Sequence, residues 1–146
     1  MLKLVLILNA LWFASAFHVF HIRRKIFAKI IVPKEHRDTP VFETLIATGP
    51  FLGGFNLAFS LLNILLLIFI QDFDKDIQWA ILLMVNAVAH GSQFAGNVPI
   101  AIANKRGEGV WHVFKGLMLF IFVIDFTLMI FNGALSITYF MTSPQG

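Results

Sequence analysis

Four long apolar stretches, separated by short polar segments, divide the chain. They cover about residues 2–22, 45–70, 77–103 and 113–141. A helix needs roughly 20 apolar residues to cross the hydrocarbon core of a bilayer, so each stretch is long enough to span it. The segment Gln71–Asp76 is a short acidic turn, which makes the second and third helices antiparallel neighbours. The pattern predicts an all-α membrane protein, a single transmembrane domain over residues 1–146 built as an up-and-down four-helix bundle.

The segment over residues 23–40 joins the first two stretches and is rich in basic residues. In its first half, isoleucine and phenylalanine fall on one helical face, and arginine and lysine surround the other. We expect either a short helix in the membrane interface, with its basic residues towards lipid phosphates, or an extension of the first span. Pro33 should end this helix, because proline lacks the amide hydrogen that a helix interior requires.

Gly49 and Gly53 lie four residues apart near the start of the second span. This spacing puts two small residues on one helical face, where another helix can approach closely. Pro50 lies between them and predicts either a kink or the true beginning of the helix.

Each of the last three spans carries polar residues at helical spacing. The polar positions are Asn56, Ser60 and Asn63 in the second span, Asn86, His90, Gln93 and Asn97 in the third, and Asp125, Asn132 and Ser136 in the fourth. The intervals place the members of each set on one helical face. Because an unpaired polar group at bilayer depth is costly, we expect the three faces to turn towards one another.

The midpoints of these spans fall near residues 57, 89 and 126. At a helix rise of about 1.5 Å per residue, Asn56, His90 and Asp125 lie at one level near the bilayer centre. We therefore expect His90 to be the partner of Asp125, and the pair to take up and release a proton as a unit. Asn56, Asn86 and Gln93 are candidates to orient a bound polar group or water. The alternative is that these side chains only hold the helices together through buried hydrogen bonds.

The histidines raise a second possibility, a metal or haem site. His18 and His21 are three residues apart in the first span, so both can face one site, and His90 or His112 can join them from another helix. Imidazoles from different helices can bind zinc, copper or a haem iron. The spacing matches no specific metal motif, and for His21 the alternative is an interfacial side chain beside basic residues. The sequence prefers neither haem nor a particular transition metal as cofactor.

The composition supports a membrane protein and excludes several kinds of catalytic and metal site. Of the 146 residues, 58% are hydrophobic and 13% are charged, and the mean hydropathy is +0.82, whereas soluble domains carry about a quarter charged residues. Cysteine is absent, which excludes disulfides, thiolate metal sites and a cysteine nucleophile. The sequence contains neither a phosphate-binding loop nor a serine nucleophile elbow, so nothing in it favours an enzyme.

Charged residues predict the orientation and the partners. Nine lysines and arginines fall in the first loop, the third loop or their edges, whereas the opposite side carries only Lys3 and Lys75. Because positive residues stay in the cytoplasm, both termini should lie outside, which is the periplasm if the membrane is a bacterial inner membrane. Membrane edges and anionic lipids, rather than nucleic acid, explain the net charge of +3.

Three segments carry a resemblance to a known group. They are Thr48-Gly-Pro-Phe-Leu-Gly-Gly-Phe-Asn56, Ala89-His90-Gly-Ser-Gln93-Phe-Ala-Gly-Asn97-Val-Pro99, and Lys115-Gly116 followed by Ile-Phe-Val-Ile-Asp125. Together with the N-terminal span, this layout resembles the BphX-like family of small bacterial four-helix membrane proteins. The resemblance implies a small integral membrane protein of that architecture, and it implies no substrate, cofactor or residue role.

These observations support three functional hypotheses. The first is a membrane protein with a polar intramembrane site for proton-coupled transport or small-ligand binding, with His90 and Asp125 at its centre. The second is a haem- or metal-binding redox subunit that uses His18, His21 and His90. The third is a non-catalytic accessory or lipid-binding subunit of a larger membrane complex. The small-residue faces also predict packing into a homo-oligomer or against a partner protein.

Overall fold

The computed structural model describes residues 1–109 and 111–143. The protein is all-α and 85% helical, and no strand occurs in the described part. The helices are α1 (Leu2–Phe17), α2 (Arg24–Ile31), α3 (Pro40–Ile68), α4 (Asp76–Lys105) and α5 (Gly116–Thr142). A π-helical turn, η1 (His18–Ile22), continues α1, and the short 3-10 turns η2 (Lys34–His36) and η3 (Ile70–Asp72) precede α3 and α4.

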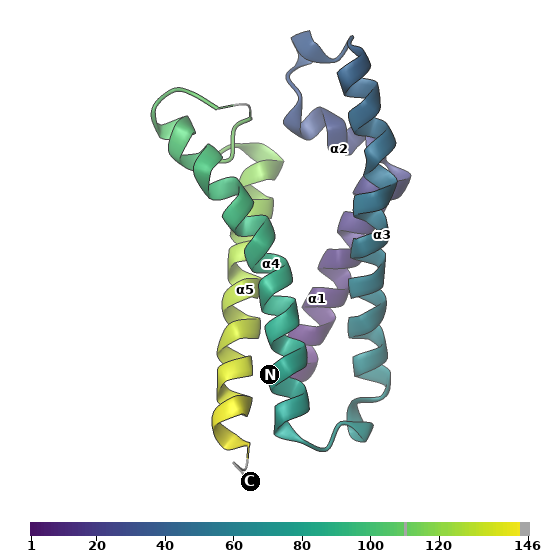
Figure 1. The fold of residues 1–146 in the computed structure, drawn as a ribbon, viewed down its shortest axis with the longest axis vertical. Coiled ribbons are helices and arrows are strands. Elements are labelled where there is room, and N and C mark those ends of the chain that lie inside the picture. Colours follow the sequence, from purple (N-terminus) through teal and green to yellow (C-terminus); the bar gives the residue numbers. More distant parts are fainter. Residues whose placement is uncertain (110, 144–146) are drawn as a thin grey trace.

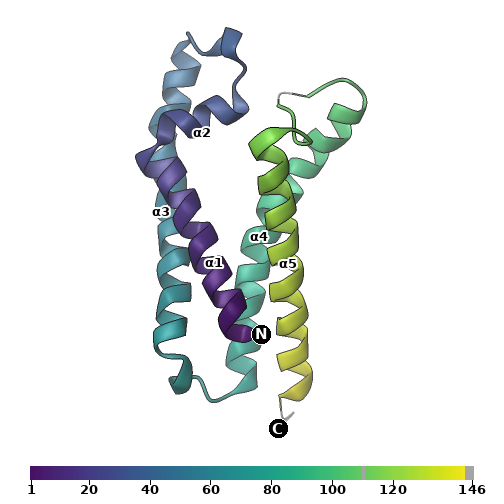
Figure 2. The same ribbon diagram turned by 180° about the vertical axis from the view of Figure 1, so that it is seen from behind.

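The four long helices form two antiparallel pairs. α1 packs against α3, and α4 packs against α5 (Figure 1). The beginning of α1 and the end of α5 lie at the end of the molecule that also holds the connection from α3 to α4 (Figure 1). At this end the beginning of α1 lies close to α4 and α5. Towards the opposite end, which holds α2 and the connection from α4 to α5, the two pairs diverge (Figure 2).

The start of α3 is set by Thr39 and Pro40. The Thr39 hydroxyl accepts a hydrogen bond from the amide of Phe42 at 3.2 Å, and Pro40 occupies the first helical position. α3 therefore begins five residues before the predicted span. Pro50 lies inside the helix, so the alternative that it marks the true beginning of the helix is wrong.

The basic segment contains the short helix α2, which ends at Ile31, two residues before Pro33, as predicted. Arg37 folds back over this end. It donates hydrogen bonds to the carbonyl oxygens of Lys29 at 2.8 Å and Val32 at 2.9 Å. The last carbonyls of a helix lack partners within the helix, so Arg37 stabilises the end of α2.

Gly49 and Gly53 allow the turn η1 to pack closely on α3. A Cβ atom built on Gly49 would lie 2.5 Å from the carbonyl oxygen of Phe20, and one built on Gly53 would lie 2.6 Å from the Cβ of His21. Neither distance leaves room for a side chain. A Cβ on the neighbouring Gly54 would have nothing within 4 Å. The close approach predicted for the glycine pair is therefore confirmed.

Three helical segments are long and apolar enough to cross a membrane: Leu2–Ile22, Pro40–Ile68 and Gly116–Thr142. Large apolar side chains are exposed along them, for example Phe51 and Phe55 of α3, which suits a lipid environment. These are the features of an integral membrane protein. α4 is equally long, at 30 residues, but it is not among the three, because its polar stripe lowers its hydropathy.

Candidate functional site

Four buried asparagines, one from each long helix, form a hydrogen-bonded group that we call the asparagine cluster. They are Asn9 of α1, Asn63 of α3, Asn86 of α4 and Asn132 of α5, and none has accessible surface. Asn9 and Asn132 pair reciprocally, each Nδ2 donating to the other's Oδ1 at 2.9 Å. Asn9 also donates to Asn63 Oδ1 at 3.2 Å, and Asn63 donates to Asn86 Oδ1 at 2.9 Å. The asparagine cluster therefore joins all four long helices inside the protein.

Backbone carbonyls decide which way these amides point. Asn63, Asn86 and Asn132 each donate through Nδ2 to the carbonyl oxygen four residues earlier, at 2.9, 3.0 and 2.8 Å. A carbonyl oxygen only accepts, so the Oδ1 atoms of Asn63 and Asn132 are left to accept from Asn9. Asn9 must present its Nδ2 to them, and its Oδ1 then faces His90.

His90 links the asparagine cluster to Asp125. His90 Nε2 lies 3.2 Å from Asn9 Oδ1, which only accepts, so Nε2 carries a hydrogen. His90 Nδ1 lies 3.2 Å from Asp125 Oδ1, and both residues are fully buried. A hydrogen bond between these atoms needs one hydrogen, present either as imidazolium with carboxylate or as imidazole with carboxylic acid. The predicted contact is confirmed, and in either form the pair shares one proton and has no net charge.

α1 holds both members of the pair in place. The indole Nε1 of Trp12 donates to Asp125 Oδ1 at 2.8 Å. The next residue, Phe13, stacks on the His90 ring with centroids 4.6 Å apart, and it also stacks on Phe59 of α3 with centroids 5.0 Å apart. The ring of Phe13 therefore covers one face of the imidazole, while the acid accepts from the indole.

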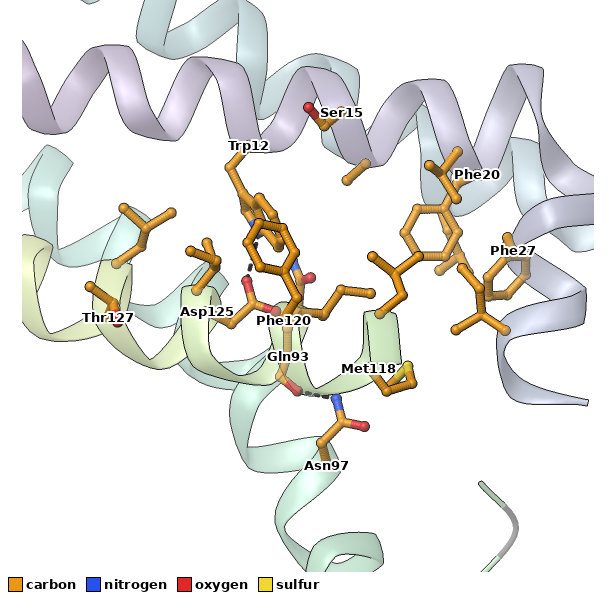
Figure 3. A pocket seen from close by; sticks show the side chains of 18 of the residues that line it. Trp12, Ser15, Phe20, Phe27, Gln93, Asn97, Met118, Phe120, Asp125 and Thr127 are labelled. Atoms are coloured by element: carbon orange, nitrogen blue, oxygen red, sulfur yellow. Dashed lines mark hydrogen bonds between the residues drawn. The ribbon is translucent and has the colours of Figure 1, made fainter. Parts of the chain in front are cut away.

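Asp125 is one of the residues that line a cavity of about 690 Å³, which we call the Asp125 cavity. Asp125 Oδ2 is buried and has no hydrogen-bond partner among the residues that the structure describes. The cavity lies between α1, α2, α4 and α5, and Figure 3 shows Trp12 reaching across it to Asp125. Its aromatic lining consists of Trp12, Phe20, Phe27, Trp111, Phe120 and Phe131. Native proteins pair nearly all buried polar atoms, so an unpaired carboxyl oxygen beside a cavity requires an explanation.

Of the three residues predicted to orient a ligand, only Gln93 borders the Asp125 cavity. Asn86 reaches the pair only through the asparagine cluster. Asn56 donates to the carbonyl oxygen of Leu52, and its buried Oδ1 has no partner within the described residues. Asn56 lines a second cavity of about 530 Å³ between α1, α3 and α4, which Gln93 also borders.

The histidines predicted to bind a metal do not converge. His18 and His21 are exposed on η1, whereas His90 is fully buried. Within residues 1–109 and 111–143, no group of three histidine, aspartate or glutamate side chains is placed to hold a metal ion. The structure therefore does not bring the predicted metal set of His18, His21 and His90 together. The backbone of His21 packs against Gly53 of α3, while the two ring nitrogens of His90 are engaged by Asn9 and Asp125.

The sequence-based prediction missed Asn9 and Trp12 as site residues. Asn9 is the only amide side chain in the first apolar stretch. Helix rise places it at about the depth of Asn63, Asn86 and Asn132, and this shared depth is the signal that points to it. Trp12 lies one helical turn further on the same face. Its residue type alone does not separate it from a tryptophan that faces lipid.

Known proteins give no further guide to the site. No protein-family model, no curated protein and no solved structure matches the chain. The resemblance to the BphX-like family therefore stays a prediction, and the function is inferred from the geometry of the site.

Proposed function

We propose that this protein binds a small amphipathic ligand inside the membrane, at the His90–Asp125 pair and the Asp125 cavity. The observation that carries the proposal is Asp125 Oδ2, a buried acceptor without a partner in the described chain, beside a mainly apolar cavity. Leaving a buried polar group unpaired costs about 1–3 kcal/mol, and more for a charged group. A ligand with a polar head and an apolar body satisfies both the oxygen and the cavity.

The shared proton supports coupling of this ligand to proton movement. Asp125 lines the cavity, one of its oxygens shares the proton with His90, and the other has no partner in the described chain. A ligand that binds the second oxygen changes the charge balance of the pair, so ligand binding and proton binding are thermodynamically linked. Such linkage is what proton-coupled transport requires.

The proposed site needs four membrane spans, with α4 as the fourth. α4 packs along α5 and buries Asn86 and His90, so these polar side chains avoid lipid. The basic residues of α2 and of the connection from α4 to α5 favour a cytoplasmic location for that end, with both termini outside. In a bacterial cell this corresponds to the inner membrane.

A cavity-filling variant tests the proposal. Ile121 lines the Asp125 cavity, whereas Val123, two positions away on α5, is 49% exposed and does not line it. We expect Ile121→Trp to lose binding of a fluorescent amphiphile that the wild-type protein binds, because the indole occupies the same space. Val123→Trp adds the same side chain on the outer surface and should bind like wild type. Equal binding by all three proteins in a fluorescence titration would exclude the cavity as the site.

A lipid-binding bundle is the second candidate, and α2 is the observation that favours it. Phe27, Ile30 and Ile31 line the Asp125 cavity from one side of α2, while Arg24 and Lys25 are exposed. A phospholipid chain in the cavity would bring its phosphate to these basic residues. Phospholipid that co-purifies in stoichiometric amounts, equally with wild type and Asp125→Asn, would favour this candidate over the first.

A further inference from the structure

The Asp125 cavity presents one acid among aromatic rings. Its lining in the described chain includes no lysine, arginine, histidine or second acid. Trp12 and Phe120 meet edge to face with ring centroids 5.6 Å apart, and Figure 3 shows both next to the Asp125 carboxyl group. Because the face of an aromatic ring attracts cations, the electrostatic character of this cavity favours positive charge.

Hydrogen bonding further limits the chemical class of the ligand. Asp125 Oδ1 already accepts from Trp12 and contacts His90 Nδ1, so Oδ2 is the atom left for a ligand. A ligand that only accepts, such as a ketone or an ester, gains nothing from a carboxylate oxygen. The ligand must donate, and an ammonium group forms a stronger hydrogen bond with a carboxylate than a neutral hydroxyl does.

We infer that the ligand is a lipophilic amine, bound as the ammonium form to Asp125 Oδ2 with its apolar body in the Asp125 cavity. This inference rests on the proposed function and names its ligand class. A volume of about 690 Å³ is within the range of sites for drug-sized molecules. Exposed apolar residues at the margin, such as Leu11 and Phe120, open the cavity towards lipid, so a lipophilic amine can enter from the bilayer.

Binding exchanges the ammonium for the shared proton. Before binding, His90 and Asp125 hold one proton and no net charge. An added ammonium would leave one uncompensated positive charge in apolar surroundings, which is unfavourable. The pair therefore releases its proton to water, and the bound state consists of imidazole, carboxylate and ammonium. The neutral imidazole has one N–H left, which it donates to the Asp125 carboxylate, so the contact of Nε2 with Asn9 Oδ1 loses its hydrogen bond. No other titratable side chain in the described residues contacts Asp125: α1 contributes Trp12, α4 contributes His90, and the charged residues of α2 do not line the cavity.

The test compares two probes that differ only in the head group, naphthylethylamine and naphthylethanol. Each probe is titrated calorimetrically into the purified full chain in detergent micelles. Repeating the titration in buffers of different ionisation enthalpy gives the number of protons released on binding.

We expect binding of the amine to release about one proton per molecule bound, and the affinity for the amine to fall by about tenfold per unit decrease in pH. The alcohol should bind more weakly and release none. Asp125→Asn should weaken amine binding by roughly thirtyfold or more, and Val123→Trp should leave it unchanged.

The outcomes separate the ligand class from the proposed function. Equal binding of amine and alcohol without proton release would overturn the amine assignment and leave the ligand site standing. Unchanged amine affinity in a folded Asp125→Asn protein would overturn it as well. Binding of neither probe would count against both the inference and the proposed function. The proton count is measured on the wild-type protein, so it decides the inference even if Asp125→Asn does not fold.

Discussion

The asparagine cluster and the Asp125 cavity are adjacent regions that satisfy their buried polar atoms to different degrees. In the cluster every side-chain amide is bonded to another side chain or to a backbone carbonyl. The two buried side-chain oxygens without partners in the described residues, Asp125 Oδ2 and Asn56 Oδ1, both lie on residues that line cavities. Neutral amides that bond one another hold helices together, whereas an unpaired acid suits a ligand.

The arrangement of the helices also differs between the asparagine cluster and the Asp125 cavity. The two helix pairs lie close together where the asparagine cluster joins them, and they diverge towards α2 and the connection from α4 to α5 (Figure 2). The asparagine cluster therefore joins the helix pairs at one end, and the proposed ligand site lies towards the other end. Substitutions made in one region at a time, with the free energy of unfolding as the measurement, separate the two roles.

The largest loss of stability is expected from Asn9→Leu. Asn9 contacts Asn63, Asn132 and His90, and leucine leaves all three without that partner. We expect the free energy of unfolding to fall by about 2–4 kcal/mol, measured by far-ultraviolet circular dichroism during unfolding by sodium dodecyl sulfate in mixed micelles.

The matched control is Ser15→Ala on the same helix, because Ser15 is exposed and bonds only to its own helix. It should change the free energy of unfolding by less than about 0.5 kcal/mol. Similar effects of the two substitutions would mean that the asparagine cluster does not hold the four helices together.

The second largest loss of stability is expected from Gly53→Ala, which disturbs the packing of η1 on α3. Gly53→Ala places a Cβ atom 2.6 Å from the Cβ of His21, and we expect the free energy of unfolding to fall by about 1–3 kcal/mol. Gly54→Ala is the control, since its Cβ meets nothing within 4 Å, and alanine should stabilise the helix there by about 1 kcal/mol or less. If both variants shift unfolding in the same direction and by the same amount, the close packing of η1 on α3 is contradicted.

Much of the polar interior was predictable from the sequence, because helix spacing and rise are regular. His90 and Asp125 lie on helices whose midpoints are easily counted, and their contact follows from depth and the cost of unpaired polar groups. The same regularity explains why the ends of the spans lie within a few residues of the helix ends. Whether the pair works with a ligand stays a prediction.

Other features depend on packing that spacing alone does not reveal. The role of Trp12 requires the rotation of α1 about its axis, which is set by contacts of η1 with Gly49 and Gly53. The three histidines of the metal prediction do not converge for a related reason. Residues three apart share a helical face, but the face of η1 that carries His18 and His21 is exposed and does not point towards His90.

A smaller loss of stability is expected for Asp125→Asn, in contrast with its large effect on amine binding. Asparagine still accepts from Trp12, and the substitution removes an ionisable group from the interior, which offsets part of the lost hydrogen bond with His90. We expect the free energy of unfolding to fall by about 1–2 kcal/mol, less than for Asn9→Leu. A loss as large as that of Asn9→Leu would show that Asp125 is mainly a structural residue.

The smallest effect is expected for the bond between Trp12 and Asp125, measured by a double-mutant cycle of Trp12→Phe with Asp125→Asn. The indole donates to Asp125 Oδ1 at 2.8 Å, and interhelical hydrogen bonds of this kind contribute about 0.6 kcal/mol on average in membranes. The cycle with Asp125→Asn should therefore give a coupling energy of about this size, or less if the asparagine still accepts a hydrogen bond from Trp12.

Trp111→Phe provides the control cycle, because Trp111 donates to Asn97 and not to Asp125. The effect of Trp111→Phe on the free energy of unfolding should add to that of Asp125→Asn. Coupling in the Trp111 cycle equal to that of Trp12 would mean that the indole of Trp12 acts on the pair through general packing. Coupling confined to Trp12 would mean that α1 holds the carboxyl group of Asp125 through the bond to Oδ1, which leaves the second oxygen without a partner from α1.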